Sequence, residues 1–74
     1  MIVETERGGE RYVVAYGVMC RASDAAWQIL FSPDGPAIWV PKSQCSIEYL
    51  PDKGSDCVAV EMPRWLAREK GMLQ

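Results

Sequence analysis

The residues best able to carry chemistry in this chain are three cysteines and ten acidic residues, and no histidine accompanies them. Cys20, Cys45 and Cys57 form no Cys-x-x-Cys pair, so they offer neither a zinc-ligand spacing nor an even pairing for disulfides. Each lies in an apolar stretch, where a reduced cysteine behaves as a small core residue. We therefore predict no metal site, no required disulfide and no cofactor.

The missing histidine also disfavours catalysis, because imidazole is the side chain best suited to moving protons near neutral pH. A serine or cysteine nucleophile would lack that base, and no glycine-rich loop has the spacing of a phosphate cradle. Two carboxylate pairs lie close in sequence, Glu4 with Glu6 and Asp52 with Asp56, and solvated charge explains both. The sequence predicts a binding protein with no catalytic residues.

Length and composition indicate one small globular domain spanning residues 1–74. The chain is 49% hydrophobic and 24% charged, and a domain of this size buries only about 60% of its unfolded surface. No apolar run approaches the roughly 20 residues of a membrane span, and residues 1–7 lack the features of a secretory signal. We expect a cytoplasmic monomer or weak dimer with no membrane partner.

Turn signals divide the chain into short apolar segments. The strongest, Ser32–Pro36, combines proline, aspartate and glycine and predicts a hairpin. Pro63 favours the start of a helix of about two turns, and Gly71 favours its end. Such a helix is too short to stand alone, so it must dock on the sheet through Trp65, Leu66 and either Met72 or Leu73. Strands are predicted at residues 11–20, 26–31, 37–40, 44–50 and 57–62.

These elements predict a β-rich α+β fold, a small bent antiparallel sheet or barrel of about five strands with a short C-terminal helix. Gly17 lies within the first predicted strand, which suggests a bulge or a close backbone contact there. The predicted core consists of Val14, Ile29, Leu30, Ile38, Ile47, Val58, Val60 and Leu66.

Two segments in the C-terminal half carry a recognisable pattern, Ile38–Gln44 (IWVPKSQ) and Met62–Leu73 (MPRWLAREKGML). Together they resemble small phage and prophage proteins in which an IWVPKSQ-like strand end precedes a PxWLAxxKGL-like helix. The chain departs from that pattern at Arg64, where an acid is usual. The resemblance implies a phage origin, and with it the cytoplasm of a bacterial host.

The formal net charge is −2, and the distribution of charges suggests a binding surface. If the strands form a meander that reverses at residues 41–43, the acidic turns gather at one end of the sheet. An acidic end can meet a basic groove on another protein. The predicted partner-binding residues are Glu10, Asp34, Asp52 and Asp56, and the basic residues expected at the opposite end are Arg21, Lys42, Arg64, Arg68 and Lys70.

By type, the chain resembles anti-CRISPR proteins, which are commonly small, often acidic binders that occupy a surface on a Cas protein. We therefore predict a phage-encoded inhibitor that binds a basic, nucleic-acid-handling surface of a host Cas effector complex. The alternative is a phage replication or recombination accessory protein that binds single-stranded DNA through stacking and phosphate contacts. Its residues would be Trp39, Lys42, Arg64 and Arg68, although an acidic chain gains little attraction to phosphates.

Overall fold

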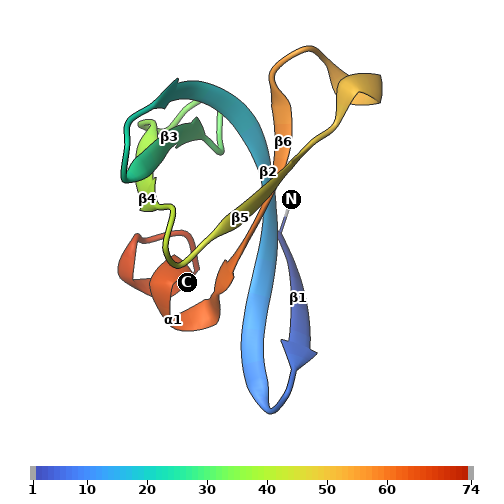
Figure 1. Ribbon diagram of the computed structural model, residues 1–74, viewed down its shortest axis with the longest axis vertical. Coiled ribbons are helices and arrows are strands. Elements are labelled where there is room, and N and C mark those ends of the chain that lie inside the picture. Colours follow the sequence, from blue (N-terminus) through green and yellow to red (C-terminus); the bar gives the residue numbers. More distant parts are fainter. Residues whose placement is uncertain (1, 74) are drawn as a thin grey trace.

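The computed structural model describes residues 2–73, in which one bent antiparallel sheet is followed by a short C-terminal helix (Figure 1). The sheet is open and contains six strands within the described residues, which confirms the β-rich α+β class. The elements are β1 (Ile2–Arg7), β2 (Glu10–Ala22), β3 (Ala26–Leu30), β4 (Ile38–Pro41), β5 (Ser46–Tyr49), η1 (Pro51–Lys53), β6 (Cys57–Pro63) and α1 (Arg64–Glu69).

The long strand β2 organises the sheet, whose order is β4-β3-β2-β6-β5 with β1 also paired to β2. One edge of β2 pairs with β6. The other edge pairs first with β1, as far as Ala15, and then with β3, from Val18 onward. The register shifts between Met19 and Arg21, and such a bulge bends the strand and increases its twist.

The predicted meander is wrong. Every pairing is antiparallel, so β4 and β5 both run in the direction of β2, and the chain does not reverse at residues 41–43. Instead β5 forms a hairpin with β6, and β6 returns to pair with β2. Long-range pairing of this kind leaves no local signature around Pro41.

The strand β1 was not among the five strands predicted from the sequence. Its signal is the Gly8-Gly9 pair between two strand-like segments, the residues of a two-residue hairpin. Gly8 has φ 60° and Gly9 has φ 84°, and a type I′ turn needs positive φ at both positions. The hairpin projects from the body of the domain in Figure 1, and all six residues of β1 are exposed.

The core lies on the inner face of the bent sheet. Of the predicted core, Ile29, Val58, Val60 and Leu66 are buried, and Ile38 and Ile47 are half-buried against them. Leu30 is a wrong assignment, because it lies on the outer face of β3 beside Val18. Val14 is a wrong assignment, because alternate residues of a strand face opposite sides and Val13 is the one that points inward. The fully buried side chains are Ile29, Met62, Val13, Val40, Val58 and Val60.

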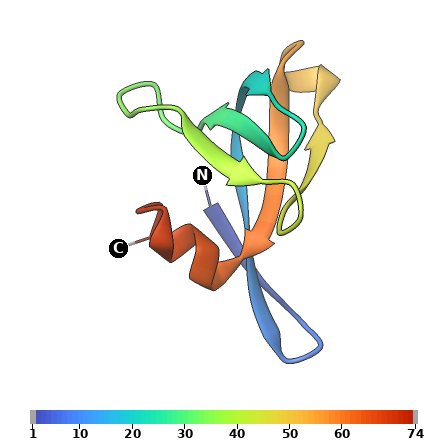
Figure 2. The ribbon, with the colours of Figure 1, turned by 60° about the vertical axis from the view of Figure 1, so that its left-hand side comes forward.

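The helix α1 closes the inner face and ends as predicted at Gly71. Leu66 and Ala67 are buried, and Met72 and Leu73 pack against the core. Trp65 is exposed, so the prediction that it docks on the sheet is wrong, because the helix turns Leu66 and Ala67 inward instead. The Met72 N–H donates to the Ala67 carbonyl and the Gly71 N–H to the Arg68 carbonyl, which is the Schellman pattern. Pro63 is the last residue of β6 and occupies the N-cap position of α1 without a side-chain capping bond, so the helix follows directly on the end of the strand (Figure 2).

Candidate functional site

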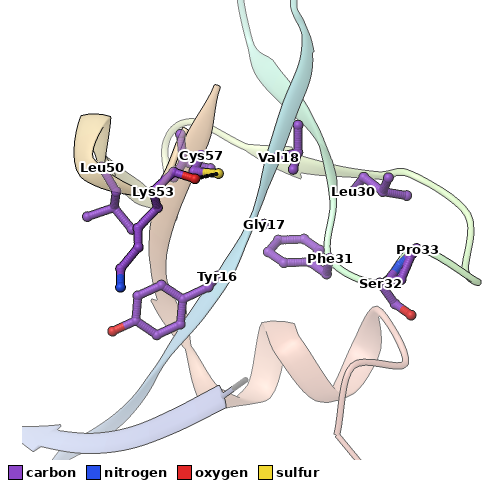
Figure 3. Close-up of a pocket in the computed structure, with 11 residues that line it drawn as sticks. Tyr16, Gly17, Val18, Leu30, Phe31, Ser32, Pro33, Leu50, Lys53 and Cys57 are labelled. Carbon is purple, nitrogen blue, oxygen red and sulfur yellow. Dashed lines mark hydrogen bonds between the residues drawn. The ribbon is translucent and has the colours of Figure 1, made fainter. Parts of the chain in front are cut away.

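An apolar cleft of about 620 Å³ lies between the two loops that flank the C-terminal half of β2. Figure 3 shows Leu50, Lys53 and Cys57 on one side of it and Leu30, Ser32 and Pro33 on the other, with Tyr16 and Val18 projecting from β2 between them. This volume lies within the range of ligand pockets, roughly 300–1,000 Å³.

The cleft forms where β2 changes partner. Between Ala15 and Val18 the strand has passed β1 and has not yet reached β3, so the sheet is interrupted on that edge among the described residues. Gly17 lies at this point, and a Cβ there would be 2.7 Å from the Leu30 carbonyl oxygen and 2.8 Å from Ile29 Cγ2. Glycine therefore permits the close approach of β3, which confirms the expected backbone contact at Gly17.

Side chains of the cleft remain open to solvent although they are apolar. Tyr16 is 40% exposed and Val18 is 41% exposed. Cross-strand partners share a face of the sheet, so Val18 lies beside Leu30 of β3 and Cys57 of β6 on the outer face, opposite the core. An apolar hollow lined by partly exposed side chains and bordered by polar residues is a candidate interaction site.

The two loops that border the cleft, which we call its rim, carry exposed carboxylates. Asp34 follows Pro33 in the loop after β3, while Asp52 and Asp56 flank Lys53 and Cys57 in the loop after β5. All three are exposed, and none forms an ion pair with another described residue. The rim of the cleft thus carries three carboxylates against the single ammonium of Lys53.

Of the four predicted partner-binding residues, Asp34, Asp52 and Asp56 lie on the loops that border the cleft, and Glu10 does not. Glu10 starts β2 at the tip of the β1–β2 hairpin, which is at the opposite end of the molecule from η1 in Figure 1. The prediction that Glu10 joins the acidic turns is wrong, because it depended on the meander. The sequence did not predict the cleft. Its one local signal was Gly17 within a predicted strand, whereas the two loops that form the walls of the cleft come together only because β6 pairs with β2.

The alternative nucleic-acid residues are not gathered on one face. Trp39 is 41% exposed on the outer face of the sheet, whereas Arg68 lies on α1, which packs against the inner face. Arg64 donates from Nε to Glu4 Oε1 at 3.0 Å. The ammonium of Lys42 lies 5.4 Å from the Trp27 ring centre in a cation–π contact. The basic residues are also divided between two ends of β2, with Arg21 near one end and Arg64 beside the other.

Two ion pairs instead hold the β1–β2 hairpin to the body. Glu4 pairs with Arg64 on the inner side of the sheet, and Arg7 pairs with Glu61 on the outer side. The guanidinium of Arg7 also lies 5.2 Å from the Tyr12 ring centre. These contacts give Arg64 a structural role at this position.

The three cysteines have different environments, and all are unpaired. Cys20 is exposed at the bulge of β2, so the expectation that it is a core residue is wrong. Cys57 lines the cleft, and its thiol donates to the Lys53 carbonyl at 3.3 Å. Cys45 packs against the core, and burial raises the pKa of its thiol to about 11, although the nearby Lys70 ammonium acts in the opposite direction.

Residues 2–73 contain no group of three or more Cys, Asp or Glu side chains positioned to hold a metal ion. Over the same residues, no helix has the length and apolar character needed to cross a membrane. No family model, curated protein or solved structure matches the chain. The chemistry of the cleft is therefore the basis for a functional proposal.

Proposed function

We propose that this chain is a protein-binding domain whose cleft receives an apolar side chain of a partner while its acidic rim pairs with basic residues around that side chain. The observation that supports the proposal is an apolar cleft whose lining residues Pro33, Lys53 and Cys57 are each adjacent in the chain to an exposed aspartate, Asp34, Asp52 and Asp56. An apolar centre with a polar rim is the ordinary anatomy of a protein interface.

Anchoring in the cleft would supply most of the affinity. Binding energy in interfaces concentrates in a few side chains that fill well-packed pockets and lose their water. The walls offered by Val18, Leu30 and Leu50 suit an aromatic or branched aliphatic anchor. A cleft already open in the free domain also needs little reorganisation before binding.

The rim would supply specificity and speed of association. Exposed charges of opposite sign attract over about 8–10 Å at ordinary ionic strength and raise association rates more than they raise affinity. Carboxylates on both sides of the cleft favour a partner with lysine or arginine on both sides of its anchor. Basic surfaces of this kind line proteins that handle nucleic acids.

The narrower form of the proposal is a phage-encoded, anti-CRISPR-like inhibitor acting in the bacterial cytoplasm on a Cas effector complex. In that role Asp34, Asp52 and Asp56 would occupy a groove that otherwise holds phosphates. Direct binding to a purified Cas effector, competed by its guide or target strand, would support this form. Equal binding in the presence of saturating strand would contradict it.

The general proposal is testable with a short synthetic peptide in which one phenylalanine is flanked on both sides by lysines. In a titration of the isotope-labelled domain followed by NMR, we expect the amide signals of Tyr16, Val18, Leu30 and Lys53 to shift together. A peptide with serine in place of phenylalanine, and another with glutamates in place of lysines, should cause little change. Equal shifts with all three peptides would contradict the proposal.

Charge-reversal variants distinguish the effect of the rim carboxylates on binding from the effect of the net charge of the domain. Asp34→Lys combined with Asp52→Lys should slow association with the basic peptide and remove most of its salt dependence. The matched control, Glu10→Lys with Glu69→Lys, changes the net charge equally but leaves the rim intact. If both double variants lose binding equally, the acidic rim has no specific role.

A further inference from the structure

The register of β2, β3 and β4 places Trp39 on the same outer face as the cleft. Gln28 of β3 lies opposite Arg21 on one side and opposite Trp39 on the other, which makes one cross-strand row of three side chains. Leu30, which lines the cleft, is the next residue of β3 on that face. Adjacent strands are about 4.8 Å apart and residues along a strand about 3.4 Å, so the Cα atoms of Trp39 and Leu30, one strand and two residues apart, are separated by about 8 Å.

Trp39 is not needed for the core. Its neighbours in β4 face inward, Val40 being fully buried and Ile38 packing against the core cluster. Trp39 itself remains 41% exposed on an edge strand, because β4 pairs only with β3 among the described elements. An aromatic ring with about two-fifths of its surface exposed is open to a partner, and tryptophan is enriched at interface hot spots.

The sign of the charge changes along this face. The loops that border the cleft carry the three rim carboxylates, whereas the far end of the row carries Arg21, next to the turn that leads into β3. Asp24 is the single acid in that turn. A partner that covers both regions must therefore present basic groups to the cleft and an acidic or neutral hydrogen-bonding group to the row.

We propose that Trp39 is a second anchor point of the same protein interface and that Arg21 and Gln28 orient the partner by donating hydrogen bonds to a carboxylate of the partner beside the ring. This rests on the proposed function, because it extends the footprint of the cleft. The partner it fits is a protein surface with two apolar contacts, one set among basic residues and the other beside an acid. Two such contacts joined in one molecule bind more tightly than either alone.

A two-site peptide tests the proposal. The basic phenylalanine peptide is extended through a short Gly-Ser linker to a leucine flanked by glutamates, long enough to span the distance between Leu30 and Trp39. We expect it to bind the wild-type domain roughly tenfold more tightly than the basic peptide alone. In Trp39→Ala this gain should disappear, while the affinity for the basic peptide stays unchanged.

Trp65→Ala is the matched control, because Trp65 is 54% exposed but lies on α1. It should keep both the basic-peptide affinity and the gain from the extension. A gain that persists in Trp39→Ala would overturn the role of Trp39 and leave the cleft proposal standing. Failure of the basic peptide to bind the wild-type domain would instead overturn the proposed function.

Single-stranded DNA provides the competing outcome. If a short oligothymidine bound at ordinary salt and shifted the Trp39 indole N–H signal, the ring would be a base-stacking platform and the second-anchor proposal would be wrong. We expect no such shift, because the acidic rim of the cleft repels the phosphates that would follow the base.

Discussion

The two faces of the sheet carry similar side chains in opposite situations. On the inner face Val13, Val60 and Met62 are fully buried beneath α1. On the outer face Tyr16, Val18 and Trp39 remain about two-fifths exposed, because no element among residues 2–73 covers them. The comparison shows that residue type alone does not separate a stabilising apolar side chain from a binding one.

Truncation of the inner face should have the largest effect. Leu66→Ala removes a buried side chain from α1, and we expect a loss of about 2–5 kcal/mol in the free energy of unfolding. Urea denaturation measures this loss. The neighbouring exposed variant, Trp65→Ala, should change stability by less than about 0.5 kcal/mol. Equal losses in the two variants would break the distinction between the helix faces.

Crowding at Gly17, where β3 approaches β2 closely, should have the next largest effect on stability. Gly17→Ala forces its new methyl group against the Leu30 carbonyl and Ile29, and overpacking of this kind costs about 1–3 kcal/mol. Gly35→Ala is the control, since its Cβ would be 3.7 Å from the nearest atom, Ser32 Cβ. Thermal unfolding should show a lower melting temperature for the first variant alone.

The reactivity of the cysteine thiols tests the same contrast between buried and exposed side chains. Below pH 9, the raised pKa of Cys45 lowers its thiolate fraction about a hundredfold relative to an unfolded thiol, so alkylation should reach exposed Cys20 first. Mass spectrometry of the partly alkylated protein identifies the modified residue. Prior modification of Cys45 would contradict its burial.

The same shift predicts a pH dependence of stability. Because the folded pKa of Cys45 lies above the ordinary value of 9.0, the folded state holds the proton more tightly than the unfolded state. The resulting stabilisation of the folded state is fully present below pH 9 and is lost as the pH rises through about 11. Melting curves of wild type and Cys45→Ala across that window should converge. A constant difference between them would contradict the assignment.

The ion pairs of the projecting hairpin should have the smallest effect. Glu4 is mostly exposed in its pair with Arg64, so a double-mutant cycle with Glu4→Gln and Arg64→Gln should give a coupling of about 0.2–1 kcal/mol that decreases at high salt. A coupling above about 2 kcal/mol would mean that the hairpin is an integral part of the domain's stability.

The sequence by itself determined the features that depend on neighbouring residues. Ser32–Pro36 indicated the β3–β4 hairpin, Gly71 ended α1, and the apolar segments indicated a β-rich fold with a docked helix. These signals are readable because turn and capping chemistry act within a few residues. The Gly8-Gly9 hairpin was equally local, and its signal was available in the sequence.

Only the tertiary structure decided which strands are neighbours. The return of β6 to β2 turns the loop around Asp52 and Asp56 toward the loop around Asp34 and leaves Glu10 at the other end. The choice of Val13 over Val14 for the core likewise depends on register, since a shift of one residue exchanges the two faces of a strand. Pairing between distant segments is selected by the packing of the whole core, so no single stretch of sequence encodes it.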